Sequence, residues 1–114
     1  MPLVIGLHGR GDRAENFGRI FEQLRLPIRA VLARAPIPWG QGGGRAWFDL
    51  DSPKGAEQVT SQVSALDQLI ERLKTRYPDA PAPILLGFSQ GAMLSLQMLA
   101  RHPDRLGGII ALSG

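Results

Sequence analysis

Four short apolar runs divide the chain into a regular pattern. They are Leu3–Leu7, Ile28–Ala33, Ile84–Phe88 and Gly107–Leu112. Short continuous runs of this kind are typical of strands that are buried on both faces of a parallel sheet. Longer segments with helical periodicity separate the runs, so right-handed strand–helix–strand crossovers are expected. The pattern predicts a three-layer α/β/α sandwich around a mainly parallel four-stranded sheet, in a single domain over residues 1–114.

The first periodic segment follows Leu3–Leu7. Asp12 followed three residues later by Glu15 is a helix-start signal, and Pro27 limits the helix at its other end. The apolar positions in between recur at i, i+3, i+4 and i+7 and are Phe17, Ile20, Phe21 and Leu24. One continuous helix that is capped by Asp12 is therefore expected.

Two further helices are expected. The longer one has Ser52 as its N-cap and Pro53 at its first position, and Pro78 ends it. Its apolar face consists of Val59, Val63, Leu66, Ile70, Leu73 and Tyr77. The last helix follows Ser89 and has apolar residues around most of its circumference, namely Ala92, Met93, Leu94, Leu96, Met98 and Leu99. We expect this helix to be the most buried of the three.

The turn between the third strand and the last helix carries the sequence Gly87-Phe88-Ser89-Gln90-Gly91. This is the G-x-S-x-G spacing of a nucleophile elbow, which requires a strand before it and a helix after it. A serine in such a strained turn brings the backbone two residues on either side too close for a Cβ atom, which explains both glycines. Ser89 is therefore a candidate nucleophile, with the Gln90 amide and the positive end of the helix below it. An ordinary turn is the alternative, because glycine is abundant in this chain.

The connection from Ala35 to Asp51 is long and rich in proline and glycine. Long ordered loops in compact domains are frequently functional. This one contains Trp39, Trp47 and Phe48, which either form the wall of a substrate pocket or attach the loop to the core. The sequence leaves both interpretations open.

Composition excludes several classes of site. The 114 residues are 44% apolar and contain no cysteine, which excludes a disulfide framework and a thiolate metal site. The two histidines and the scattered carboxylates lack the spacing of metal ligands, so no metal or other cofactor is expected. No glycine-rich phosphate-binding motif follows a strand, which excludes a nucleotide site of the common kinds.

Charge and hydropathy limit the classes of partner and the cellular location that are expected for this chain. The net charge is +3, but basic and acidic residues are interleaved and no two lysines or arginines are adjacent, so we expect no nucleic-acid partner. No run of about 18 apolar residues occurs, and the first residues lack the basic flank of a signal peptide. A cytoplasmic protein without integral membrane association is therefore expected.

Four segments carry a resemblance to a known family. They are LHGRGD at Leu7–Asp12, WFDL at Trp47–Leu50, GFSQGA at Gly87–Ala92 and GIIALSG at Gly108–Gly114. In these segments the chain resembles the N-terminal portion of the α/β-hydrolase group of carboxylesterases, lysophospholipases and acyl-protein thioesterases. The resemblance implies a partial α/β-hydrolase fold and the hydrolysis of small-molecule carboxylic esters or thioesters through an acyl-enzyme.

The resemblance also implies roles for individual residues. Ser89 is the nucleophile, and the backbone N–H groups of Arg10 and Gln90 form the oxyanion hole. The loop around Arg10 is rich in glycine, which lets an amide face the substrate oxygen without a side chain between them. Trp47 and Phe48 line the acyl pocket in this interpretation.

A serine nucleophile needs a base to accept its proton and an acidic group to orient that base. After Ser89 the chain has only His102 and Asp104 as candidates, and His102 lies 13 residues along the helix, which is about 20 Å. His8 is at the correct edge of the sheet, but in the family's oxyanion motif this histidine is structural. Asp49 is expected to fix its loop as a hydrogen-bond acceptor. The triad Asp and His are therefore expected to be missing from this sequence.

Two interpretations of the function remain. The first is a serine ester hydrolase of which this chain is the front half, with an activity that requires residues outside it. The second is an inactive fragment, or a subunit of a split assembly, that retains the elbow only as structure. In both, the strand Gly107–Leu112 would leave an apolar edge unpaired, so instability, self-association or pairing with a complementing chain is expected.

Overall fold

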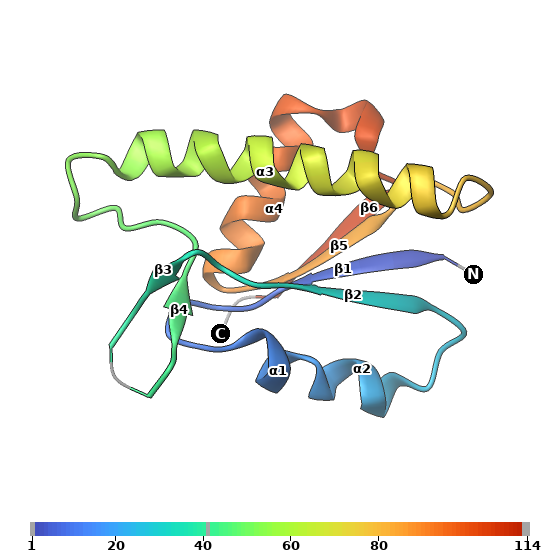
Figure 1. Cartoon of the computed structure of the whole chain (residues 1–114), viewed down its shortest axis with the longest axis horizontal. Coiled ribbons are helices and arrows are strands. Elements are labelled where there is room, and N and C mark those ends of the chain that lie inside the picture. Colours follow the sequence, from blue (N-terminus) through green and yellow to red (C-terminus); the bar gives the residue numbers. More distant parts are fainter. Residues whose placement is uncertain (1, 41, 113–114) are drawn as a thin grey trace.

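The computed structural model describes residues 2–40 and 42–112. Its main sheet has four parallel strands in the order β2-β1-β5-β6 (Figure 1). The strands are β1 (Leu3–Leu7), β2 (Arg29–Ala33), β5 (Ile84–Phe88) and β6 (Gly108–Leu112). The predicted sheet is confirmed, and the predicted bounds differ from the observed ones by at most one residue. Because the strands run in one direction, the loops that follow them meet at one edge of the sheet, here called the carboxyl edge.

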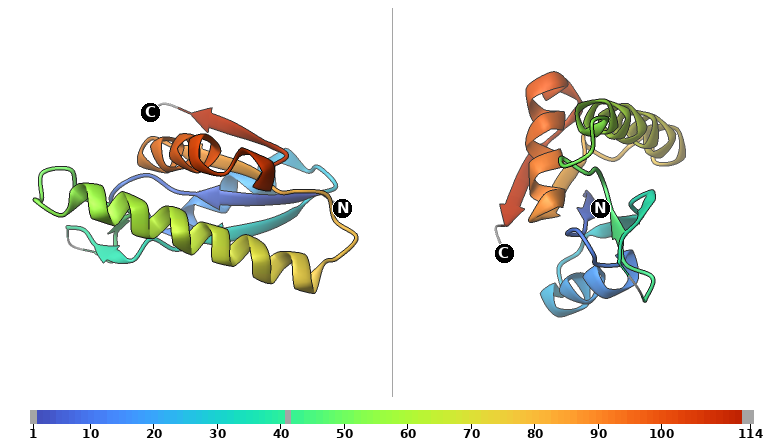
Figure 2. Two further views of the ribbon diagram at one scale, coloured as in Figure 1. Left: turned by 90° about the horizontal axis from the view of Figure 1, so that it is seen from above. Right: turned by 90° about the vertical axis from the view of Figure 1, so that its left-hand side faces the viewer.

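Helices cover both faces of the sheet. On one face lie α1 (Ala14–Phe17) and α2 (Arg19–Leu24), and on the other lie α3 (Gly55–Arg76) and α4 (Gln90–Arg101). The right-hand view of Figure 2 shows the two pairs on opposite sides of the strands. A short 3₁₀ helix, Pro103–Arg105, connects α4 to β6. The predicted three-layer α/β/α sandwich is confirmed.

The larger part of the core lies between the sheet and the layer of α3 and α4. Residues of β1 alternate between the two faces: Ile5 packs in this larger cluster, whereas Val4 packs with Phe17 in the smaller one. Every residue of β1 is buried, as expected for a central strand covered on both faces. From α3 the larger cluster receives the predicted apolar positions Val63, Leu66, Ile70 and Leu73.

The first helical segment differs from the prediction. It forms two short helices, α1 and α2, that are separated at Gly18. A Cβ atom at Gly18 would lie 2.7 Å from Leu32 Cδ1, so glycine lets this turn pack directly on β2. Asp12 is not the cap: the N-cap of α1 is Arg13, and the Asp12 carbonyl accepts a hydrogen bond from the Arg45 amide at 3.0 Å. The prediction of one continuous helix with an Asp12 cap was therefore wrong.

The long connection after β2 contains a small antiparallel hairpin, which the sequence pattern does not indicate. Its strands are β3 (Ile37–Pro38) and β4 (Arg45–Ala46). The hairpin is attached to the loop after β1, because the Gly11 amide donates to the Arg45 carbonyl at 2.8 Å. Both connections therefore lie together at the carboxyl edge.

The predicted start of the second long helix was wrong by two residues. α3 begins at Gly55 with Lys54 as its N-cap. Ser52 instead forms a turn, in which its Oγ accepts a hydrogen bond from the Lys54 amide at 3.2 Å and its carbonyl accepts one from the Gly55 amide at 3.0 Å. Within the described residues, no helix has the length and apolar composition needed to cross a membrane.

Apolar side chains are exposed on α4 and on the edge strand β6. Met93 and Leu96 on the outer side of α4 are 47% and 51% exposed. Six of the 12 residues of α4 are nevertheless buried, compared with five of the 22 residues of α3, so the expectation that α4 is the most buried helix is confirmed. On β6, which pairs only with β5 in the main sheet, Ile110 is 49% and Leu112 37% exposed. Within the described residues, β6 therefore forms an unpaired edge of the sheet that exposes apolar side chains.

Candidate active site

Ser89 lies at the turn between β5 and α4, at the carboxyl edge. Its φ of 56° and ψ of −111° fall in a region that side-chain-bearing residues rarely adopt, which costs on the order of 1–3 kcal/mol. The conformation is held from both sides, because the Ser89 amide donates to the Leu112 carbonyl at 2.8 Å and its carbonyl accepts from the Met93 amide at 3.1 Å. The residue is exposed and is the N-cap of α4. Its hydroxyl is therefore accessible beside the positive end of a helix.

The two glycines of the pentapeptide are required by close backbone contacts. A Cβ atom at Gly87 would lie 2.7 Å from the Ala92 nitrogen. A Cβ atom at Gly91 would lie 2.8 Å from the His8 carbonyl oxygen and even closer to that of Leu7. The steric explanation from the sequence therefore holds for Gly87, whereas Gly91 is required because α4 starts directly against the end of β1.

The loop after β1 lies against the elbow. A Cβ atom at Gly9 would be 3.5 Å from Ser89 Cβ and 3.3 Å from the Phe88 ring, so the two turns touch. Arg10 follows directly, with its side chain exposed and its guanidinium 5.1 Å from the centre of the Trp39 ring. None of the described residues accepts a hydrogen bond from the amide of Arg10 or of Gln90. Both amides belong to the two turns that meet at Ser89.

His8 is completely buried, and both of its ring nitrogens have partners. Nδ1 lies 2.8 Å from the Gly9 carbonyl oxygen, and Nε2 accepts a hydrogen bond from the Ala35 amide at 3.2 Å. This pairing assigns the proton to Nδ1, which donates to the carbonyl. With its acceptor nitrogen occupied, His8 ties the loop after β1 to the connection after β2 and is not placed to accept a proton from Ser89.

The Gln90 side chain is a second connection, which the sequence did not indicate. Its Oε1 accepts hydrogen bonds from the amides of Trp47 and Phe48 at 2.6 Å and 3.4 Å, and its Nε2 donates to the Phe48 carbonyl at 2.8 Å. The residue is buried, and its partners lie more than 40 residues away along the chain. Gln90 therefore attaches the Trp47–Phe48 segment to the start of α4.

Trp47 and Phe48 are 3% and 2% exposed and belong to the larger core cluster. The Trp47 indole also donates from Nε1 to the His8 carbonyl at 2.7 Å. In this position the two rings attach the loop to the core, which is one of the two interpretations left open by the sequence. Their contact with an acyl chain stays a prediction.

The two remaining candidate residues, Asp49 and His102, take part in hydrogen bonds that fix the local backbone. Asp49 Oδ1 accepts a hydrogen bond from the Asp51 amide at 3.1 Å, so its expected role in fixing the loop is confirmed. His102 is the C-cap of α4, and its amide donates to the Met98 carbonyl at 2.8 Å. It therefore lies at the far end of the helix that begins after Ser89. The structure brings together Ser89, the loop of Arg10, and the segment of Trp47 and Phe48, but not His102.

Replacing Gln90 by glutamate tests how much the hydrogen bonds between the Gln90 side chain and the Trp47–Phe48 segment stabilise the fold. The carboxylate keeps an acceptor for the Trp47 amide but loses the donor to the Phe48 carbonyl, and it places a buried negative charge beside that oxygen. We expect a loss of about 1–3 kcal/mol in the free energy of unfolding, measured by urea denaturation. Gln97→Glu on the exposed side of the same helix is the matched control, with an expected change within about 0.5 kcal/mol. Equal stability of the two variants would show that the Gln90 hydrogen bonds contribute little.

A serine in a glycine-flanked turn between a parallel strand and a helix, at the carboxyl edge of the sheet, defines the α/β-hydrolase class of fold. Solved structures agree. The carboxylesterase from Mesorhizobium loti superposes with a TM-score of 0.79 at 21% identity, covering 97% of this chain and 56% of that one. SOBER1 from Arabidopsis thaliana superposes with a TM-score of 0.72 at 22% identity, covering 95% and 59%. At these identities the likeness establishes the fold, which is present here in part.

The sequence profile of the phospholipase/carboxylesterase family matches residues 1–114, and the chain belongs to that family. It is 35% identical over 128 aligned positions to acyl-protein thioesterase 1 of Candida albicans, covering 97% of this chain and 55% of the thioesterase. It is 28% identical over 119 positions to esterase YpfH of Escherichia coli, covering 98% and 51%. The chain thus spans about half the length of these curated relatives.

Proposed function

We propose that the protein carrying this sequence is a serine hydrolase of small-molecule carboxylic esters or thioesters, with Ser89 as its nucleophile. The observation that carries the proposal is the conformation of Ser89: an accessible hydroxyl at a positive φ of 56°, held at the start of α4 by backbone contacts on both sides. Strain of this kind persists only where the surroundings impose it, and it is concentrated at functional sites. Family membership supports the same chemistry.

The proposed reaction proceeds in two stages. Ser89 Oγ attacks the carbonyl carbon and loses its proton to a base, while the carbonyl oxygen becomes an oxyanion. The amides of Arg10 and Gln90, which donate to none of the described residues, donate hydrogen bonds to this oxyanion. The intermediate then releases the alcohol or thiol and leaves an acyl-enzyme, which water hydrolyses by the same route.

The base and the acid that orients it are proposed to come from residues other than those described. Both ring nitrogens of His8 have partners, and His102 is at the opposite end of α4 from Ser89. A base must lie within hydrogen-bond reach of the hydroxyl whose proton it accepts. The relatives are about twice as long as this chain, so residues of this kind have room in the remaining length of such a protein.

A second candidate function is a catalytically inactive fragment, or a subunit of a split assembly, in which the elbow serves only as structure. The observation behind this alternative is the exposed apolar edge of β6, because an unpaired edge strand is a template for another strand. In this case the edge pairs with a complementing chain or with a second copy, and Ser89 has no activated hydroxyl.

A fluorophosphonate probe separates the two candidates, because it reacts with activated serines. The protein that carries this sequence is treated with the probe, digested, and examined by mass spectrometry. We expect the adduct on the peptide containing Ser89, its loss in Ser89→Ala, and its retention in Ser64→Ala, which changes an exposed serine of α3. An unlabelled Ser89 in the folded protein would favour the inactive fragment or subunit.

A further inference from the structure

Three arginine side chains from separate segments surround one cavity at the carboxyl edge. Arg13 precedes α1, Arg34 follows β2, and Arg45 lies in β4. The cavity has a volume of about 360 Å³, and Glu15 is its one acidic lining residue. No local sequence pattern indicates this cluster, because the three arginines are not neighbours in the chain and only the hairpin brings Arg45 to the other two.

The hydrogen bonds around the cavity leave positive charge available. Arg34 Nη2 forms an ion pair with Glu15 Oε1 at 2.8 Å, and Arg45 Nη1 donates to the Pro36 carbonyl at 3.2 Å. The Glu15 pKa is lowered by a hydrogen bond from its own backbone, then by Arg34 and by the charge of Arg13, so this carboxylate is ionised at neutral pH. It compensates one guanidinium. The cavity therefore keeps a net positive charge, with Arg13 in no ion pair among the described residues.

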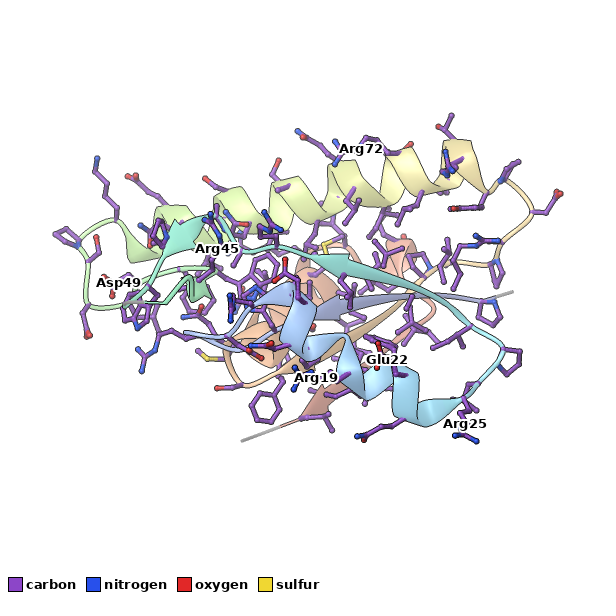
Figure 3. The ribbon with its side chains drawn as sticks, turned by 60° about the horizontal axis from the view of Figure 1, so that its bottom comes forward. Arg19, Glu22, Arg25, Arg45, Asp49 and Arg72 are labelled. Carbon is purple, nitrogen blue, oxygen red and sulfur yellow. The ribbon has the colours of Figure 1, made fainter. Side chains whose placement is uncertain are left out.

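The loop after β1 connects the cavity to Ser89 at the carboxyl edge of the sheet. Gly9 touches Ser89, and the Asp12 amide donates to the Gly9 carbonyl at 3.2 Å, which closes a turn. A turn of this kind keeps its ends within about 7 Å, so the Cα atom of Arg13 is at most about 11 Å from that of Gly9. Figure 3 shows Arg45 at the same end of the molecule as Asp49, whereas Arg25 lies at the other end. The right-hand view of Figure 2 looks onto the end that carries the hairpin.

We propose that this cavity binds an oxyanion, a carboxylate or a phosphate, that is part of the ester substrate attacked by Ser89. Guanidinium groups donate paired hydrogen bonds to both kinds of oxyanion. Arg45 is held in place by the Pro36 carbonyl, and Arg13 supplies a second guanidinium. The inference rests on the proposed esterase function and adds a substrate preference for esters that carry an anionic group in addition to the scissile bond.

The test compares matched para-nitrophenyl esters whose acyl chains end in a methyl, a carboxylate or a phosphate group. In the protein that carries this sequence, we expect kcat/KM to be at least about tenfold higher for one or both anionic esters than for the methyl ester. The preference should shrink in high salt, since the guanidinium groups are exposed. Arg13→Gln should lower kcat/KM for the anionic esters and so remove most of the preference. Arg25→Gln is the control, because it removes the same charge at the far end.

The outcomes separate this inference from the proposed function. Equal kcat/KM for all three esters, or equal losses of preference in Arg13→Gln and Arg25→Gln, overturns the anion site and leaves the esterase function intact. Hydrolysis of none of the esters overturns the esterase function. In that case a titration with inorganic phosphate, followed by NMR, decides the anion site alone: saturable shifts at the amides of residues 13, 34 and 45 that Arg13→Gln abolishes support it, and their absence overturns it.

Discussion

Ser89→Ala is expected to lower kcat/KM for ester hydrolysis by about 10³-fold or more in the protein that carries this sequence. The proposed reaction has no other nucleophile, so what remains is binding and the hydrogen bonds to the oxyanion. Steady-state hydrolysis of a neutral para-nitrophenyl ester measures the effect, with Ser64→Ala as the matched control. A Ser89→Ala variant that keeps most of its activity would exclude Ser89 as the nucleophile.

Stability distinguishes this loss from unfolding. Alanine keeps the Cβ atom, and therefore the strain of the positive φ at residue 89, so we expect the free energy of unfolding to change by less than about 0.5 kcal/mol. Glycine at the same position relieves the strain and should raise the stability by about 1 kcal/mol while also removing the hydroxyl. If Ser89→Gly is instead less stable than Ser89→Ala, the strain at residue 89 is not as described.

Gly91→Ala is expected to destabilise the fold by about 3 kcal/mol or more. This is the largest stability effect expected here from the addition of one methyl group. The added Cβ would lie 2.8 Å from the His8 carbonyl oxygen and closer still to that of Leu7. These atoms belong to the backbone of a central strand and its loop, so they cannot rotate away as a flexible side chain would. α4 would have to move off β1. Thermal or urea denaturation measures the change.

Gly108→Ala is the matched control, since it adds the same methyl group to another glycine. No heavy atom lies within 4 Å of a Cβ atom built at Gly108, and its φ lies outside the left-handed region. We expect a change within about 1 kcal/mol, because only the backbone preference of glycine is altered. Similar losses in Gly91→Ala and Gly108→Ala would mean that the contact between α4 and β1 is not tight.

The strands and the elbow could be predicted because their causes are local. β1 and β5 are short apolar runs that are bounded on both sides by residues typical of turns. Gly87 and Gly91 indicate backbone contacts that leave no room for a side chain. The parallel order follows from the alternation of strands and helices. The helix after β1 was mispredicted because its interruption at Gly18 depends on packing against Leu32 of β2, which apolar periodicity does not contain.

Most of the structure around Ser89 depends on contacts between distant residues, so the sequence could not reveal it. The Gln90 side chain bonds to a segment more than 40 residues away, and His8 bonds to Ala35. Either residue could equally have faced solvent or substrate as far as its neighbours in the chain indicate. The arginine cavity also could not be predicted from the sequence. Along the chain the basic residues alternate with acidic ones, and only the fold brings the arginines together.

An experimental structure of the protein that carries this sequence, after reaction with a phosphonate ester, tests the central claim most directly. We expect phosphorus bonded to Ser89 Oγ, with the phosphoryl oxygen about 2.7–3.1 Å from the amide nitrogens of Arg10 and Gln90. An adduct on another residue, or an oxygen turned away from both amides, would contradict the proposed catalytic role of this turn.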